Sequence, residues 1–208
     1  MKMRFVVTAG PTREHLDPVR FLSNPSTGKM GFAIAAEAAR RGHAVTLVAG
    51  PSALKTPQGV KRVDVVSARD MLKAVKEAVC GAAPAVLVAT AAVADWRPAK
   101  CAAKKLKKGE MSPTLKLVRN PDILKTVHGV RKVGFAAETN DVLAEATRKC
   151  REKKLDFIVA NDVTRRGCGF GTDTNRVTFV FPDGTLRRLP MMTKRMVAKR
   201  IVDEIARV

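Results

Sequence analysis

Apolar and polar positions change their spacing repeatedly along the chain, and the pattern predicts strands that alternate with helices. Short apolar, β-branched runs predict buried strands at 4–10, 44–50, 85–93, 132–139 and 155–163. Ala-rich, capped or amphipathic stretches predict helices at 27–43, 67–79, 140–154 and 193–208. Such an order is typical of a mostly parallel sheet with helices on both faces. The predicted class is therefore α/β.

Local signals refine this prediction at three places. Ser67 followed by Asp70 has the pattern of a capping box. Asn120 followed by Pro121 predicts a helix with Asn120 as its N-cap and Pro121 as its first residue. Alternating residues around an Asp-Gly pair predict a β-hairpin at 176–189. We expect one Rossmann-like domain over residues 1–208.

The segment 96–118 lacks a regular pattern. It is rich in Lys, with Gly and Pro around the letters KKLKKGEMSP. Such a composition predicts an exposed, mobile flap rather than part of the core. The hairpin at 176–189 raises a different question, because a lone hairpin with apolar Val177, Phe179 and Phe181 is marginal unless that face is covered. We therefore expect a homodimer.

The charge of the chain is its most unusual bulk property. Its 208 residues carry a formal net charge of +20. An excess of this size favours polyanionic ligands, which include nucleic acid, acidic membranes and small phosphorylated substrates. With eight Phe, one Trp and no Tyr, the chain offers few base-stacking platforms. Nucleic acid is therefore not the expected partner, although a basic Rossmann-like nucleotide- or nucleic-acid-binding module without catalysis remains the alternative.

Other bulk features point to the cytoplasm. No apolar run approaches the ~18–20 residues that a membrane-spanning helix needs. The first residues run directly into a predicted strand, so we expect no signal peptide and no membrane association. The cysteines are expected to be free thiols, because their spacing matches neither a C-x-x-C pair nor a metal site: Cys80, Cys101, Cys150 and Cys168.

Two familiar nucleotide motifs are incomplete in the segment that follows the first strand. A P-loop reads G-x-x-x-x-G-K-[ST], but here Ser23 and Met30 replace the first glycine and the final hydroxyl residue. A dinucleotide fingerprint needs three glycines after the strand, where Gly10 stands alone. Because the chain also has no Tyr, a nicotinamide-dependent short-chain reductase is disfavoured. What remains is a loop that leads into a helix start at Ser26, Thr27 and Gly28, where free N–H groups favour an anion.

The segments after the other strands add further short motifs to the one after the first strand. They read TAAVADWRP, GFAAET and VANDV, and their small residues let a ligand approach the backbone. Together with DPVRFLSNPSTGKMG, KLKK and NPDIL, their order and spacing resemble the phosphopantothenoylcysteine synthetase family, also called phosphopantothenate–cysteine ligase, of the bacterial CTP-dependent type. The resemblance runs from about Met3 to Ile205.

The resemblance implies a reaction in coenzyme A biosynthesis. Members of this family are Rossmann-type dimers that activate the carboxylate of 4′-phosphopantothenate with CTP and Mg²⁺ and release pyrophosphate. Cysteine then attacks the acyl-cytidylate, which gives the amide and CMP. The excess of positive charge fits this implication, since both non-amino-acid substrates are polyanions. The choice between CTP and ATP, the metal ligands and the cysteine-binding residues stay open.

The resemblance also implies roles for individual residues. Asn24 would contact the acyl group, and Lys105 would lie over the α-phosphate; both are the candidate catalytic residues. Substrate contacts are expected at Arg20, Asn24, Ser26, Thr27, Gly28, Ala91, Ala92 and Asn161. Nucleotide contacts are expected at Gly10, Asp95, Lys105, Pro121, Asp122, Ile123, Leu124, Phe135, Lys149 and Lys153. The spacing of Lys149 and Lys153 places both on one face of a helix.

The chain departs from the family in few respects. Pro25 stiffens the loop beside Asn24. Many bacterial relatives carry a flavin-dependent decarboxylase half before the synthetase, whereas Met1 here opens directly on the synthetase part. We expect either a separate decarboxylase chain as a partner or an excised domain, and no flavin on this chain.

Overall fold

A twisted eight-stranded sheet forms the centre of the described part of the protein. The computed structural model describes residues 2–81, 83–107, 109, 114–138, 141–162, 167–169 and 171–208. The strand order is β13-β12-β10-β9-β6-β1-β4-β5. The bounds are β1 (Arg4–Ala9), β4 (Ala44–Ala49), β5 (Val60–Asp64), β6 (Ala85–Ala89), β9 (Arg131–Glu138), β10 (Phe157–Asp162), β12 (Val177–Val180) and β13 (Leu186–Arg188).

The topology confirms the predicted fold class. All neighbours from β5 to β10 pair in parallel. β12 joins β10 antiparallel, and β13 joins β12 in the same way. Taken in chain order, the six parallel strands follow the sequence 3-2-1-4-5-6, which is the Rossmann order. In such a sheet, ligands bind beyond the carboxyl ends of the strands where the order reverses, which here is between β1 and β6.

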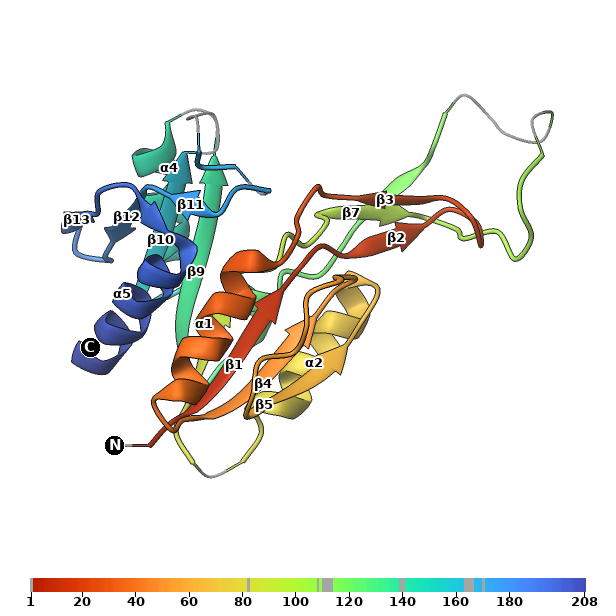
Figure 1. Ribbon diagram of the computed structural model, residues 1–208. Helices are drawn as coiled ribbons and strands as arrows, with labels where there is room; N and C mark the ends of the chain where they lie inside the picture. Colours follow the sequence, from red (N-terminus) through yellow and green to blue (C-terminus); the bar gives the residue numbers. More distant parts are fainter. Residues whose placement is uncertain are drawn as a thin grey trace.

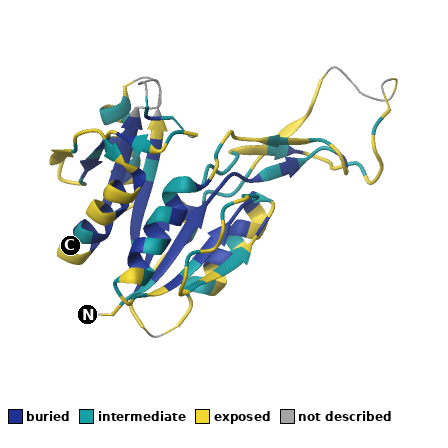
Figure 2. Ribbon diagram, viewed as in Figure 1, coloured by how far each residue is buried: buried dark blue, intermediate teal, exposed yellow. Residues whose placement is uncertain are grey.

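Helices cover both faces of this sheet (Figure 1). They are α1 (Lys29–Arg40), α2 (Ala68–Val79), the short α3 (Ile123–Thr126), α4 (Val142–Glu152) and α5 (Lys194–Arg207). α1 and α5 pack into one apolar cluster, which includes Phe32 and Ile201. α2 and α4 pack into a second cluster, which includes Met71 and Cys150. Figure 2 shows the strands between the two layers as the most buried part of the molecule.

An arm built from two small hairpins projects away from the sheet (Figure 1). β2 (Arg13–His15) pairs with β3 (Phe21–Ser23), and β7 (Trp96–Pro98) pairs with β8 (Leu117–Arg119). A third small pair, β11 (Thr174–Asn175) with β14 (Met192–Thr193), lies beside α5. The predicted flap thus begins and ends in a β-ladder at its base, while residues 108 and 110–113 lie outside the described residues.

The structure corrects two predicted element boundaries and adds strands that were not predicted. The N-cap of α3 is Asp122, whose side chain accepts the N–H of Lys125, so the predicted start at Asn120 and Pro121 is wrong. Asn120 is otherwise engaged, because its Nδ2 donates to Ala94 O at 2.8 Å. The strand predicted over 85–93 ends at Ala89, and the following residues form a loop. β5 and the arm strands were not predicted.

The hairpin was correctly predicted, but the argument from it for a dimer is wrong. β12 and β13 extend the main sheet, and Val177 and Phe179 are each only 1% exposed. Phe179 lies against Phe157 with ring centroids 5.2 Å apart, and Phe181 packs at the edge of the same cluster. This apolar face is therefore covered within the chain.

A buried carboxylate joins α1 to α5 at the base of the molecule. Glu37 accepts hydrogen bonds from Arg40 and from Arg41, at 2.7–2.9 Å. Arg41 also forms an ion pair with Asp203 on α5 at 2.8 Å. The Arg40 hydrogen bond, opposed by burial and supported by Arg41, lowers the pKa of Glu37 from 4.5 to about 2. Glu37 therefore stays ionised at pH values where ordinary glutamates are protonated.

We predict that Glu37 makes folding sensitive to acid. Because its folded-state pKa is depressed, its contribution is present above about pH 4.5 and is lost as the pH falls toward about 2. Glu37→Gln should lower the free energy of unfolding at neutral pH by about 1–3 kcal/mol. The effect is not larger because solvent screens the exposed side chain of Arg40. It should also flatten the acid limb of the stability profile, measured by chemical denaturation. Glu77→Gln, on the exposed side of α2, should do neither.

Candidate active site

A cavity of ≈ 770 Å³ opens at the carboxyl ends of β6 and β9. Its walls come from the loop after β6, the segment before and within α3, the end of β9 and the C-terminal end of α4. Lining residues include Asn24, Ala91, Ala92, Asp95, Trp96, Arg119, Asp122, Phe135, Lys149 and Lys153. The cavity therefore lies beside the point where the strand order reverses, as expected for an α/β sheet of this kind.

A second, smaller cavity of ≈ 70 Å³ lies on the other side of the end of β9. It shares Thr90 and Phe135–Ala137 with the large cavity. The remaining lining comes from the start of α1, from β10, from the segment that includes β11 and from the first residue of α5: Ser26–Gly31, Asn161, Gly169, Asn175 and Lys194. Because the two cavities share one wall, an extended ligand can lie across the strand ends and reach both.

The first turn of α1 lies unusually close to the strand ends. A Cβ added to Gly31 would lie 2.5 Å from Ala9 Cβ and from Thr90 Oγ1, so only glycine fits there. Gly28, the N-cap of α1, has φ 84°, which also favours glycine. The residues of this turn line the small cavity, where the unpaired N–H groups of a helix start and the helix dipole favour negative charge.

Asn24 connects the loop before α1 to the loop after β6. Its Nδ2 donates to Ala92 O at 3.1 Å and lies 3.4 Å from Val93 O. Ser26 N donates to Asn24 O at 2.8 Å, which folds the chain toward α1. The amide of Asn24 thus has a structural task in addition to any contact with a ligand.

The cations of the large cavity are arranged around Asp122. Lys153 Nζ lies 3.0 Å from Asp122 Oδ2, while Asp122 Oδ1 accepts the N–H of Lys125. Burial alone would raise the pKa of Asp122, but Lys153 and the Lys125 N–H hold it below its usual value. Lys149 lines the cavity one turn earlier on α4. The spacing of four residues thus places both lysines on the same cavity wall, as the sequence predicts.

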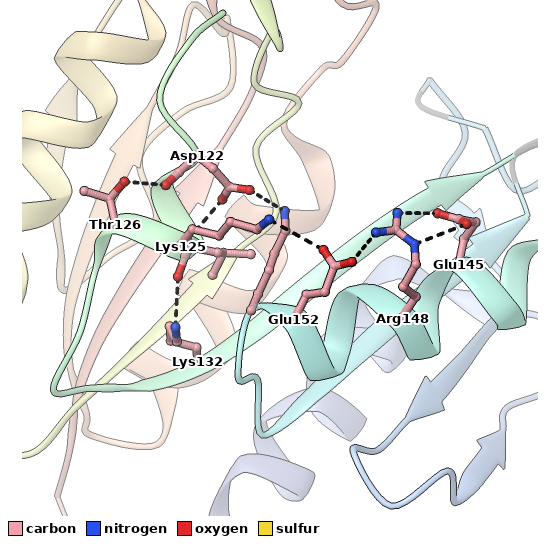
Figure 3. A network of polar contacts seen from close by, with 9 residues as sticks. Asp122, Lys125, Thr126, Lys132, Glu145, Arg148 and Glu152 are labelled. Atoms are coloured by element: carbon pink, nitrogen blue, oxygen red, sulfur yellow. Dashed lines mark hydrogen bonds and ion pairs between the residues drawn. The ribbon is translucent and has the colours of Figure 1, made fainter.

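A polar network holds α3 in place below this cavity (Figure 3). Lys132 is buried, and its Nζ donates to Leu124 O at 2.9 Å and to Val127 O at 3.4 Å. Burial lowers the pKa of Lys132. On the outer side, Lys125 lies 3.5 Å from Glu152, which also pairs with Arg148 on α4. α3 has only four residues, so these contacts rather than its own backbone fix its position.

Most of the predicted site residues come together around these cavities. Asn24, Ala91, Ala92, Asp95, Pro121–Leu124, Phe135, Lys149 and Lys153 line the large cavity, and Ser26–Gly28 and Asn161 line the small one. Three predicted residues line neither: Gly10, Arg20 and Lys105. Gly10 lies directly beneath Gly28 and bonds to Ala92 through its carbonyl. Arg20 and Lys105 belong to the arm and the segment docked on it.

Sequence reasoning missed several lining residues. Arg119 places its guanidinium 5.1 Å from the centre of the Trp96 ring, and both line the large cavity. Lys194 lines the small cavity; it is buried, and its Nζ donates to Gly169 O and Thr172 O. Arg119 could have been predicted as a cavity residue, because it directly precedes Asn120 and the predicted nucleotide contacts. Lys194 could not, because it looks like any basic residue at a helix start.

The acidic residues of the cavity suit a metal ion that binds mainly to substrate phosphates and to few protein side chains. Within the described ranges, no group of three His, Cys, Asp or Glu side chains is arranged to bind a metal ion. Asp95 is exposed at the cavity, and its carboxylate makes no hydrogen bond or ion pair with the described residues. Mg²⁺ commonly binds through one or two carboxylates together with substrate phosphates and water. Asp95 fits such a site.

Fold and site together define a class: a Rossmann-type α/β protein with a basic, nucleotide-sized cavity at the strand ends. The chain belongs to the family described as "DNA/pantothenate metabolism flavoprotein C-terminal domain", whose model matches residues 1–208. The expected resemblance is thereby confirmed.

Relatives of known name support this assignment. The chain is 48% identical over 206 residues to the coenzyme A biosynthesis bifunctional protein CoaBC of Bacillus subtilis (strain 168), covering 97% of this chain and 50% of the relative. It is 47% identical over 211 residues to CoaBC of Escherichia coli (strain K12), covering 98% and 51%. The chain thus spans about half the length of the curated relatives it matches.

A solved structure supports the fold independently. The crystal structure of the C-terminal domain of a CoaBC protein matches with a TM-score of 0.82 at 43% identity, covering 98% of this chain and 93% of that chain. Within the part of the chain that the structure describes, no helix combines the length and apolar character needed to cross a membrane.

We predict that Lys153 contributes to nucleotide binding. Lys153→Met removes a cation from the cavity and leaves Asp122 unneutralised, so the Kd for CTP should rise by about tenfold, or 1.4 kcal/mol. The effect should shrink as salt is added, in titrations at low and high ionic strength. Lys199→Met, on the exposed side of α5, is the matched control and should leave the Kd unchanged. Equal affinity in both variants would contradict the assignment.

Proposed function

We propose that the chain is a phosphopantothenate–cysteine ligase that uses CTP in coenzyme A biosynthesis. The observation that carries this proposal is the assembly of eleven predicted contact residues around the ≈ 770 Å³ cavity. Identity of 48% over nearly the whole chain to a bifunctional coenzyme A biosynthesis protein supports the same reaction class. The position of the cavity at the strand ends is the usual place for a nucleotide in this fold.

The proposed reaction has two steps. A carboxylate oxygen of 4′-phosphopantothenate attacks the α-phosphorus of CTP, a new P–O bond forms, and the bond to pyrophosphate breaks. The neutral amine of cysteine then attacks the acyl carbon and forms a C–N bond. CMP leaves with the electrons of the acyl C–O bond, and the nitrogen gives up one proton to water. Activation is needed because a free carboxylate is a poor acyl donor, whereas an acyl phosphate has a good leaving group.

The cavity residues divide these tasks. Lys149 and Lys153 lie where they can bind an anionic part of the nucleotide, and Phe135 offers an apolar surface next to the base or the sugar. Asp122 keeps Lys153 oriented before the nucleotide arrives. When bound, Mg²⁺ would supply charge neutralisation at the phosphates, with Asp95 as its protein ligand. No flavin is expected on this chain, and a cytoplasmic location remains a prediction.

Asn24 is proposed to act on the acyl group. Its amide can donate to the acyl oxygen, which gains negative charge when cysteine attacks. This help is greatest in the second transition state. The existing bond to Ala92 O restricts the amide to a fixed orientation, which favours such a role.

The direct test of the proposed function is pyrophosphate release. The full chain, mixed with Mg²⁺ and CTP, should release pyrophosphate only when 4′-phosphopantothenate is added, even without cysteine. ATP in place of CTP should release it more slowly. No release with either nucleotide, together with salt-sensitive binding to DNA or RNA, would favour a non-catalytic nucleic-acid-binding module.

A prediction for Asn24 separates the two steps. Asp at this position has a similar size but replaces the donor with an anion, which would repel the developing oxyanion. Asn24→Asp should therefore form acyl-cytidylate but transfer it to cysteine slowly, by about 10²–10³-fold. A quenched time course with labelled CTP should show the intermediate accumulating in the variant alone. If both steps slow equally, loss of the bond to Ala92 O explains the effect, and Asn24 only shapes the loop.

The oligomeric state is also part of the proposal. Apolar residues gather on the arm and on the segment next to it, where they are 39–56% exposed: Val19, Phe21, Trp96, Leu115 and Leu117. An exposed apolar group of this kind is typical of an interface, and a second copy of the chain is its proposed occupant. Neither Arg20 nor Lys105 lines the cavity of its own chain, which suits a site completed by a partner.

We predict a homodimer that depends on the arm. Leu117→Arg places a charge in the proposed interface and should convert the dimer to a monomer at micromolar concentration, measured by light scattering. Met196→Arg is the matched control, because Met196 is similarly exposed but lies on α5. A parent protein that is monomeric at the same concentration would contradict the proposal.

A further inference from the structure

Asp17 is the only acidic residue in the turn at 16–20, and its side chain is completely buried. Its Oδ1 accepts the N–H groups of Val19 and Arg20, both at 2.8 Å. This arrangement is an Asx-type turn, in which a side-chain carboxylate folds the residues that follow it. One of the two oxygens is thereby fully used within the turn.

The other oxygen reaches a segment far away in sequence. Asp17 Oδ2 accepts from Arg20 Nη1 at 2.9 Å and from Leu106 N at 3.3 Å. Arg20 Nη1 also donates to Leu106 O at 3.2 Å. Leu106 is thus held by both of its backbone polar groups, one through the carboxylate and one through the guanidinium. A further bond, from Ala102 N to Leu16 O at 2.8 Å, fixes the start of the same segment.

The carboxylate of Asp17 is held in its charged form. Burial alone would raise its pKa, but the N–H groups of Val19, Arg20 and Leu106 and the guanidinium of Arg20 lower it below the usual value. A buried anion is stable only when its acceptor positions are filled, and here four donor contacts fill them. Loss of the segment 102–106 would leave Oδ2 with one donor fewer, so the charge favours the docked arrangement.

We propose that Asp17 is a positioning residue that holds Arg20 and Lys105 as one preorganised unit. Both residues were predicted to contact the substrates. For these contacts, the inference rests on the proposed function. Neither residue is oriented by the cavity walls, since neither lines them. Their orientation comes from Asp17, which bonds Arg20 directly and anchors Leu106, the neighbour of Lys105. Preorganisation of this kind lowers the cost of assembling groups around a reacting centre.

The variant Asp17→Asn tests the two halves of the carboxylate separately. The amide keeps an oxygen for the N–H groups of Val19 and Arg20, so the turn should persist. Its NH₂ group faces the N–H of Leu106 and the guanidinium of Arg20, which are also donors, so the docking should be lost. Limited trypsin digestion followed by mass spectrometry should then show cleavage after Lys104 and Lys105 at a rate at least about tenfold above the parent, because cleavage follows local opening.

Asp70→Asn is the matched control. Asp70 also accepts a backbone N–H at a turn, that of Ser67, but it does so in the capping box of α2. This variant should leave cleavage after Lys104 and Lys105 unchanged. If Asp17→Asn does not fold, Arg20→Met removes the donor to Leu106 O from a partly exposed side chain and should give the same faster cleavage.

Kinetics distinguish positioning from a purely structural role. In the full chain, Asp17→Asn should lower kcat for pyrophosphate release by about tenfold and leave the KM for CTP nearly unchanged. Equal cleavage of parent and variants would overturn the docking, and faster cleavage with unchanged kcat would overturn the positioning role. A parent that releases no pyrophosphate would refute the proposed function, and the trypsin comparison would then decide alone whether Asp17 holds the segment.

Discussion

The close approach of α1 to the ends of β1 and β6 is the constraint on which the site depends. Gly31 allows contact with Ala9 and Thr90 that no side chain could tolerate, and Gly28 turns the chain into the helix with positive φ. As a result, the first turn of α1 lines the small cavity, next to the wall that the two cavities share. Asn24, just before this turn, bonds across to Ala92 and closes the gap between the two strand ends. A methyl group at position 31 would push α1 outward. This contact would then open, and the predicted substrate and nucleotide residues would move apart.

Local sequence signals predicted local structure well. The capping box of Ser67 and Asp70 is formed as predicted, because all of its partners lie within one turn. The strand–helix alternation predicted the parallel sheet, since each buried strand is recognisable by itself. Asn120 and Pro121 misled the prediction of α3 because the Asn120 side chain is used by Ala94, 26 residues away. The arm strands have three residues each, too few for a period to be visible.

The site was predictable only as far as a family pattern could locate it. Phe135 and Lys149 are unremarkable by residue type, since a Phe in a strand is usually core and a Lys on a helix is usually solvated. Their common cavity depends on the pairing of β9 with β6 and on the packing of α4, which are contacts distant in sequence. Arg119 and Lys194 escaped prediction for the same reason. The location of Lys105 away from the cavity follows from the arm, which no local pattern revealed.

The arrangement of charge refines what the excess of +20 means. Two cations that line the cavities are already paired with carboxylates: Lys153 with Asp122 at 3.0 Å and Lys29 with Asp173 at 2.7 Å. On the arm, Arg20 is paired with Asp17 in the same way, at 2.9 Å. A ligand with a single charge gains little by entering, because it must share each cation with an existing partner. A ligand that presents several anionic groups at the right separations can engage these cations together, and the fixed pairs hold them ready for it. Paired charge therefore favours a compact polyanion such as a nucleoside triphosphate over diffuse binding to a nucleic-acid backbone.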